Sequence, residues 1–114
     1  MHELGIVFHV AKQVETVARE NNVEHINKVV LSVGEVSTAI PSYLIDCWKW
    51  NAKKYPLLDG SELECETIKA VTFCEDCKKE YETVTYGKTC PHCGSGNTYL
   101  VTGNEVILKE VVAD

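Results

Sequence analysis

The fold is decided between residues 26 and 68, where the chain reads INKVVLSV at 26–33 and ELECET at 62–67, with a helical stretch between them. The first segment is rich in β-branched and apolar residues and predicts a strand. The second alternates three glutamates with less polar side chains, which predicts a half-buried strand. A helix between two such strands predicts a right-handed crossover and parallel pairing of the strands.

Two helices are predicted beside this pair of strands. Residues 4–20 place apolar side chains at three- and four-residue steps, at Leu4, Val7, Phe8, Ala11, Val14 and Ala18. His9 lies more than about 100° from the middle of that stripe, so we expect it at the surface. The second helix should begin at Pro41, with Ser37 and Thr38 as candidate caps, and end near Lys53.

The composition changes between residues 71 and 102, where cysteine, glycine and short β-runs at 81–86 and 98–102 replace long apolar stripes. A strong apolar strand follows at 105–112 and is long enough to return to the main sheet. We therefore expect an α/β fold: a small mixed sheet with two helices, built from residues 1–70 and 103–114. Residues 71–102 would form an inserted, zinc-ribbon-like domain with four cysteines.

Four cysteines, Cys74, Cys77, Cys90 and Cys93, follow the spacing C-x2-C-x12-C-x2-C. Two such knuckles, joined by a hairpin, can hold one ion with four thiolates at about 2.3 Å in a closed tetrahedral site. Zinc is the default ion. Iron competes with it, because the segment CPHCG at 90–94 also resembles a rubredoxin knuckle. A redox Cys-x-x-Cys would instead require a strand-to-helix context.

Charge and hydropathy exclude several classes of function. The 11 basic against 17 acidic residues give a net charge of −6, which argues against nucleic acid and anionic membranes as partners. Apolar runs are too short for a membrane helix, and the start does not resemble a secretory signal. We expect a reducing, cytoplasmic location, where Cys47 and Cys65 are small buried hydrophobes and His92 is a spacer in its knuckle.

The chain starts with Met1-His2-Glu3, for which two interpretations remain open. The three residues can be the exposed first turn of the helix. Alternatively, the α-amine, the backbone nitrogens of His2 and Glu3, and the His2 imidazole can present four nitrogens in one plane. Such a set suits Ni(II) or Cu(II).

These features together resemble HypA-type nickel chaperones, which act in the maturation of nickel–iron hydrogenases. The resemblance rests on Met1-His2-Glu3, on VGEVS at 33–37 followed by Pro41 and Leu44, on the paired cysteine knuckles, and on GNEVILKEV at 103–111. It implies a non-enzymatic protein that holds nickel at the terminus through His2, Met1 and Glu3, and zinc through the four cysteines. It also implies a HypB-type GTPase as partner, the hydrogenase large subunit or urease maturation as client, and a monomer or weak dimer.

Two other functions compete with this one. The first is a zinc-ribbon adaptor that binds another protein. The second is a rubredoxin-like electron carrier, whose four-thiolate iron would make the purified protein red. The sequence contains no Ser/His/Asp set, no glycine-rich phosphate loop and no supported carboxylate pair, so nothing in it predicts catalysis.

Overall fold

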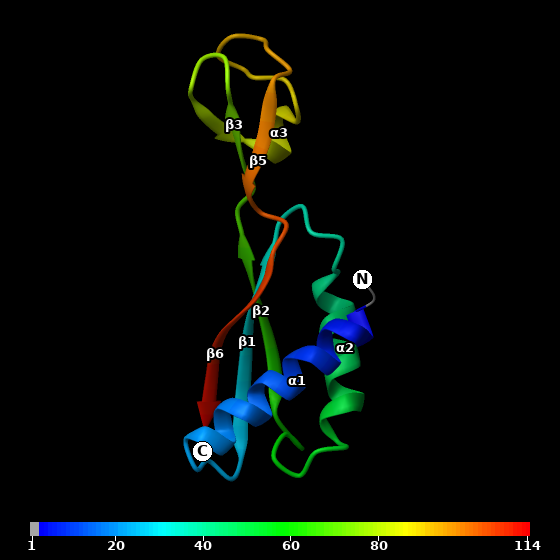
Figure 1. Cartoon of the computed structure of the whole chain (residues 1–114). Helices are drawn as coiled ribbons and strands as arrows, with labels where there is room; N and C mark the ends of the chain where they lie inside the picture. Colours follow the sequence, from blue (N-terminus) through cyan, green and yellow to red (C-terminus); the bar gives the residue numbers. More distant parts are fainter. Residues whose placement is uncertain (1–2) are drawn as a thin grey trace.

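The chain forms two three-stranded sheets that follow one another along an elongated molecule, shown in Figure 1. This computed structural model describes residues 3–114, and its principal extents are 54 × 25 × 18 Å. None of the described helices is both long and apolar enough to cross a membrane.

The main sheet contains β1 (Ile26–Gly34), β2 (Glu62–Ile68) and β6 (Val106–Ala113), in the order β2-β1-β6. β1 and β2 are parallel, with Leu31 opposite Cys65. β6 pairs antiparallel with the other side of β1. The predicted parallel pair and the predicted return of the last strand are both confirmed.

Helices α1 (Glu3–Glu20) and α2 (Pro41–Ala52) cover one face of this sheet (Figure 1). α2 contributes Trp48, which is fully buried and donates its indole N–H to the Ser61 hydroxyl at 3.0 Å. Apart from Trp48, the core beneath the helices is aliphatic. Its members include Val7, Val10, Val14, Val29, Leu31, Val33, Leu44 and Leu58.

Two details of the predicted helices are wrong. Leu4 and Phe8 were expected in the buried stripe of α1 but are 46% and 38% exposed, because α1 turns Ile6 and Val10 toward the sheet instead. Ser37 and Thr38 do not cap α2, whose N-cap is Ile40 without a side-chain bond. The Ser37 hydroxyl accepts the backbone N–H of Ala39 within the preceding loop.

The second sheet contains β3 (Val71–Cys74), β4 (Glu80–Glu82) and β5 (Thr98–Thr102), in the order β4-β3-β5 with antiparallel pairing. The β-run predicted at 81–86 is wrong beyond Glu82, because the chain turns there into the short helix α3 (Thr83–Tyr86). The hydroxyls of Thr72 and Thr83 lie 2.6 Å apart and tie this turn to β3. The fold is thus the predicted mixed α/β type, with one additional short helix.

The two sheets join at a close approach of three backbone segments. A Cβ atom on Gly34 would lie 2.0 Å from the carbonyl oxygen of Gly103, and one on Gly103 would lie 2.4 Å from Cα of Ala70. Gly103 also has φ +119°, which L side chains rarely adopt. The Glu105 carboxylate accepts the Gly103 N–H at 2.6 Å and the Thr102 hydroxyl at 2.7 Å. Only glycine fits at these two positions.

Candidate metal centres

The four predicted cysteines come together at the far end of the second sheet. Their sulfur atoms all lie within 4.8 Å of one another. Sγ of Cys74 is 3.5 Å from that of Cys93, and Sγ of Cys77 is 3.6 Å from that of Cys90. A tetrahedron with metal–sulfur bonds of about 2.3 Å has edges of about 3.8 Å. The cluster therefore fits a four-thiolate metal ion, and residues 3–114 contain no other comparable group of histidine, cysteine and acidic side chains.

The two knuckles repeat the same backbone geometry. In the first, Lys78 donates its N–H to the Cys74 carbonyl at 2.9 Å; in the second, Gly94 donates to the Cys90 carbonyl at 2.8 Å. Both turning residues have positive φ, 61° at Lys78 and 76° at Gly94. Glycine adopts a positive φ without steric cost, whereas a lysine rarely does. The sequence analysis did not predict the turn at Lys78, although its place one residue after the second cysteine of the knuckle matches that of Gly94.

A polar network outside the sulfurs links the knuckles. The Asp76 carboxylate accepts the Ser95 hydroxyl and, at 3.3 Å, the Asn97 side-chain amide. These two bonds hold the pKa of Asp76 below its usual value, so the bridge stays anionic at neutral pH. Partners of this kind orient the ligands of a metal site. No sequence motif singled out this network, because its members belong to different knuckles.

Three thiols of the cluster, Cys77, Cys90 and Cys93, have pKa values shifted from that of a free thiol. Burial raises the pKa of Cys90, but backbone N–H groups of His92 and Cys93 lower it more, to about 7. The backbone N–H of Ser95 lowers the pKa of Cys93, but neighbouring sulfurs and burial raise it more, to about 12. Cys90 and Cys93 therefore do not ionise together near neutral pH, and a bound cation would replace the proton of the higher-pKa thiol.

The remaining cysteines lie in the main body, away from this cluster. Cys47 on α2 and Cys65 on β2 are half-buried and pack against the aliphatic core. Burial raises the pKa of the Cys65 thiol, so this thiol stays protonated. Both side chains serve as small hydrophobes, as the sequence predicted, although neither is completely covered.

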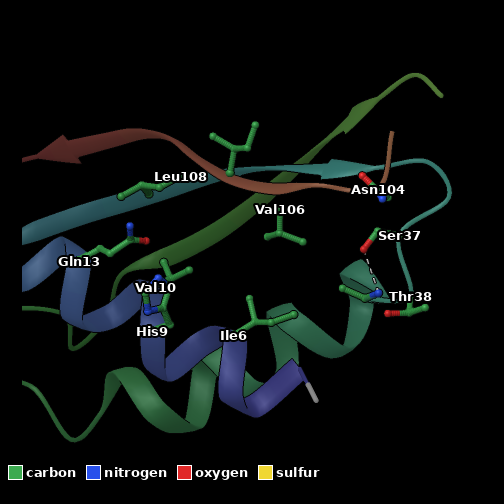
Figure 2. A pocket seen from close by; sticks show the side chains of 11 residues that line it. Ile6, His9, Val10, Gln13, Ser37, Thr38, Asn104, Val106 and Leu108 are labelled. Atoms are coloured by element: carbon green, nitrogen blue, oxygen red, sulfur yellow. Dashed lines mark hydrogen bonds between the residues drawn. The ribbon is translucent and has the colours of Figure 1, made fainter. Parts of the chain in front are cut away.

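Two histidines have the exposure that the sequence predicted. His92 is exposed in the second knuckle, where its backbone N–H donates to the Cys90 sulfur at 3.4 Å. His9 is exposed on α1 and lines a hollow of about 590 Å³ between α1, β6 and the loop that contains Ser37 (Figure 2). Neither imidazole belongs to the cysteine cluster.

Of the three predicted nickel residues, the structure describes only Glu3, since Met1 and His2 lie outside the described residues. Glu3 is the first residue of α1, and its carboxylate accepts the backbone N–H of Ile40 at 3.1 Å. Ile40 is the N-cap residue of α2. The start of α1 is therefore held against the start of α2, and a carboxylate is favourable there because helix amino termini carry partial positive charge.

Comparison with known proteins extends over the whole chain. Residues 1–113 match the family described as "Hydrogenase/urease nickel incorporation, metallochaperone, hypA". The hydrogenase maturation factor HypA of Aquifex aeolicus is 36% identical over 111 residues, covering 97% of this chain and 96% of that protein. The HypA of Moorella thermoacetica is 31% identical over 105 residues, covering 92% of each chain.

Solved structures have the same fold. The solution structure of the Ni metallochaperone HypA from Helicobacter pylori superimposes with a TM-score of 0.77 at 24% identity, covering 99% of this chain and 97% of that one. A second solution structure of a HypA protein also gives 0.77, at 25% identity. From its sequence match along nearly its whole length, its fold and its four-cysteine cluster, the chain belongs to the HypA family of nickel-incorporation metallochaperones, which are not enzymes.

Proposed function

We propose that this protein carries Ni(II) as cargo at its amino terminus and delivers it during maturation of a nickel–iron hydrogenase. The observation that carries the proposal is the family match, which includes the Met1-His2-Glu3 segment. Four nitrogens would bind the ion in one plane: the α-amine of Met1, the backbone nitrogens of His2 and Glu3, and the His2 imidazole. Ni(II) favours such a square set.

The position of Glu3 supports this arrangement. Its carboxylate is hydrogen-bonded to Ile40, so its backbone nitrogen begins α1 at a fixed place beside α2. Metal binding by this nitrogen would therefore take place at the amino-terminal end of α1, beside the start of α2.

We propose zinc as the resident ion of the cysteine cluster. A closed set of four thiolates suits zinc and leaves no open coordination position for a substrate. The second sheet has a small core, in which Tyr81 packs against buried Cys74 and Cys90. A metal would supply the cross-link that such a small core lacks. In this proposal residues 71–102 form the zinc-binding unit, and residues 1–70 with 103–114 form the nickel-binding unit.

The same proposal assigns the partners and the location. A HypB-type GTPase would be the partner in nickel transfer, and the hydrogenase large subunit would receive the ion. Nickel delivery for urease maturation is the alternative. The family description names both hydrogenase and urease nickel incorporation. We place the protein in the cytoplasm, where the reducing environment keeps the six cysteines as thiols.

Titration of tag-free protein with Ni(II) tests the nickel site. We expect one yellow-orange, diamagnetic Ni(II) per chain, and we expect His2→Ala or an added amino-terminal tag to abolish it. His9→Ala is the matched control, because His9 is exposed on the same helix and should leave binding unchanged. If His2→Ala or tagged protein binds Ni(II) as tightly as the native chain, the terminal site is wrong.

A further inference from the structure

A second hollow lies at the start of α1, beside the start of α2 (Figure 1). It has a volume of about 560 Å³, and most of the surface that lines it is apolar. Its lining residues come from the first two turns of α1 and the neighbouring part of α2: Glu3, Leu4, Gly5, Phe8, Tyr43 and Cys47. We call it the amino-terminal hollow. None of the roles assigned above involves it.

The large apolar side chains of the amino-terminal hollow are unusually exposed. Leu4 is 46% exposed, Phe8 38% and Tyr43 55%. The Cys47 thiol beside them is half-buried. Exposed apolar side chains that gather in one place mark a surface that binds something, whereas single exposed ones do not. Among residues 3–114, these side chains thus form an open apolar surface.

The chain itself provides an occupant within reach of this surface. Two residues, Met1 and His2, precede Glu3, which lines the amino-terminal hollow. A chain spans at most about 3.6 Å per residue, so Cα of Met1 lies within about 7 Å of Cα of Glu3. Phe8 lies about 7.5 Å further along the axis of α1 than Glu3, and its side chain tilts back toward the amino terminus. A long side chain on Met1 therefore reaches the hollow.

Methionine suits this hollow better than histidine does. Its side chain is flexible and apolar, it fills irregular gaps, and its sulfur makes favourable contacts with aromatic rings. Phe8 and Tyr43 provide two such rings. An imidazole placed there would lose hydrogen bonds to water, which costs free energy. The imidazole of His2 is also one of the four nitrogens in the proposed nickel site.

We propose that the Met1 side chain docks in the amino-terminal hollow, between Phe8 and Tyr43, and so positions the α-amine for Ni(II). The docking is a property of the protein without metal, whereas the positioning role rests on the proposed nickel function. The α-amine and the docked side chain share one carbon atom, Cα of Met1. Docking therefore restricts the amine before the ion arrives, and less conformational freedom is lost on binding.

Methyl NMR of tag-free, nickel-free protein tests the docking, after mass spectrometry has confirmed that Met1 is retained. Met1 is the only methionine of the chain, so labelling of the methionine methyl group gives a single signal. We expect its proton shift to lie upfield of the value in urea-unfolded protein, with NOE contacts to the rings of Phe8 and Tyr43. Both should be independent of protein concentration, since the hollow and the methionine belong to one chain.

Two variants alter the hollow without changing the four nickel nitrogens. Tyr43→Ala removes one ring at an exposed position. Gly5→Leu places a side chain in the hollow, at an exposed helix position where leucine is a better helix former than glycine. Each should move the methyl signal toward its unfolded position and weaken Ni(II) binding about 2- to 10-fold. Tyr99→Ala is the matched control: Tyr99 is 51% exposed but lies on β5, so neither quantity should change.

The outcomes separate the docking from the nickel proposal. A methyl signal at its unfolded position, without ring contacts, overturns the docking whatever the nickel titration shows. Ring contacts that appear only at high protein concentration also overturn it, because the methionine of a second copy then fills the hollow. Unchanged Ni(II) affinity in both hollow variants overturns the positioning role. A native chain with a docked methyl group that binds no Ni(II) refutes the nickel site and the positioning role, while the docking stands.

Discussion

Replacing Gly34 by alanine should strongly destabilise the main body while sparing the cysteine cluster. The new Cβ would lie 2.0 Å from the Gly103 carbonyl oxygen, whereas real Cβ contacts essentially never fall below 3.0 Å. One backbone must therefore move by about 1 Å, and overpacking of this kind costs about 1–3 kcal/mol. The movement also breaks the bond from the Val36 N–H to that oxygen, now 2.9 Å, which contributes about 1 kcal/mol. We expect a total loss of about 2–4 kcal/mol.

Urea unfolding followed by tryptophan fluorescence measures this loss, since both tryptophans lie on α2. With a slope of about 1.5 kcal/mol per M, the urea midpoint should fall by about 1.3–2.7 M. The metal content should not change, because no ligand lies at the junction. Gly96→Ala is the matched control: a Cβ there meets nothing within 4 Å, so the midpoint should stay within error. A Gly34→Ala protein as stable as the native chain would show that the junction is not closely packed.

Two other predictions concern the cysteine cluster and the contacts of His25 with Asp59 and Asp114. Cys74→Ala should lower the zinc content below the one ion per chain expected for native protein and increase hydrogen exchange in residues 71–102, with exchange in β1 unchanged; full zinc content would contradict four-thiolate binding. The backbone carbonyl of Asp59 and the Asp114 carboxylate raise the pKa of His25 above 6.5. The two contacts therefore stabilise the folded protein fully below pH 6.5, and this contribution is lost as pH rises through the raised pKa of His25. The urea midpoint of native protein should therefore exceed that of Asp114→Asn at about pH 5 and converge with it by about pH 9; a constant difference would refute the linkage.

Local patterns in the sequence predicted the features that depend on neighbouring residues. The spacing of Cys74, Cys77, Cys90 and Cys93 fixed the cluster, because each knuckle is a closed local turn. Alternation along 62–67 identified β2, and its pairing with β1 followed from the intervening helix. These signals needed no knowledge of distant contacts.

The features that escaped prediction depend on residues far apart in the chain. The orientation of α1 is set by how it packs with α2 and the sheet, so Leu4 and Phe8 are more exposed than their spacing suggested. The close approach of Gly34 to Gly103 joins positions that no local pattern connects. The nickel residues Met1 and His2 remain a prediction, since the structure describes the chain only from Glu3.

The position of the junction makes the two proposed metal sites separately testable. The start of α1 lies with the main sheet, whereas the cysteines lie beyond the junction in the second sheet (Figure 1). Among residues 3–114, the group of three or more possible metal ligands consists of the four cysteines and contains no histidine. Loss of nickel binding in His2→Ala should therefore leave zinc in place, and loss of zinc in Cys74→Ala should leave the nickel titration unchanged. If loss of zinc does weaken nickel binding, we expect the two sites to be coupled through the closely packed backbone around Gly103, where the two sheets join. Gly34→Ala, which displaces that backbone while keeping all four cysteines, should then weaken nickel binding as well.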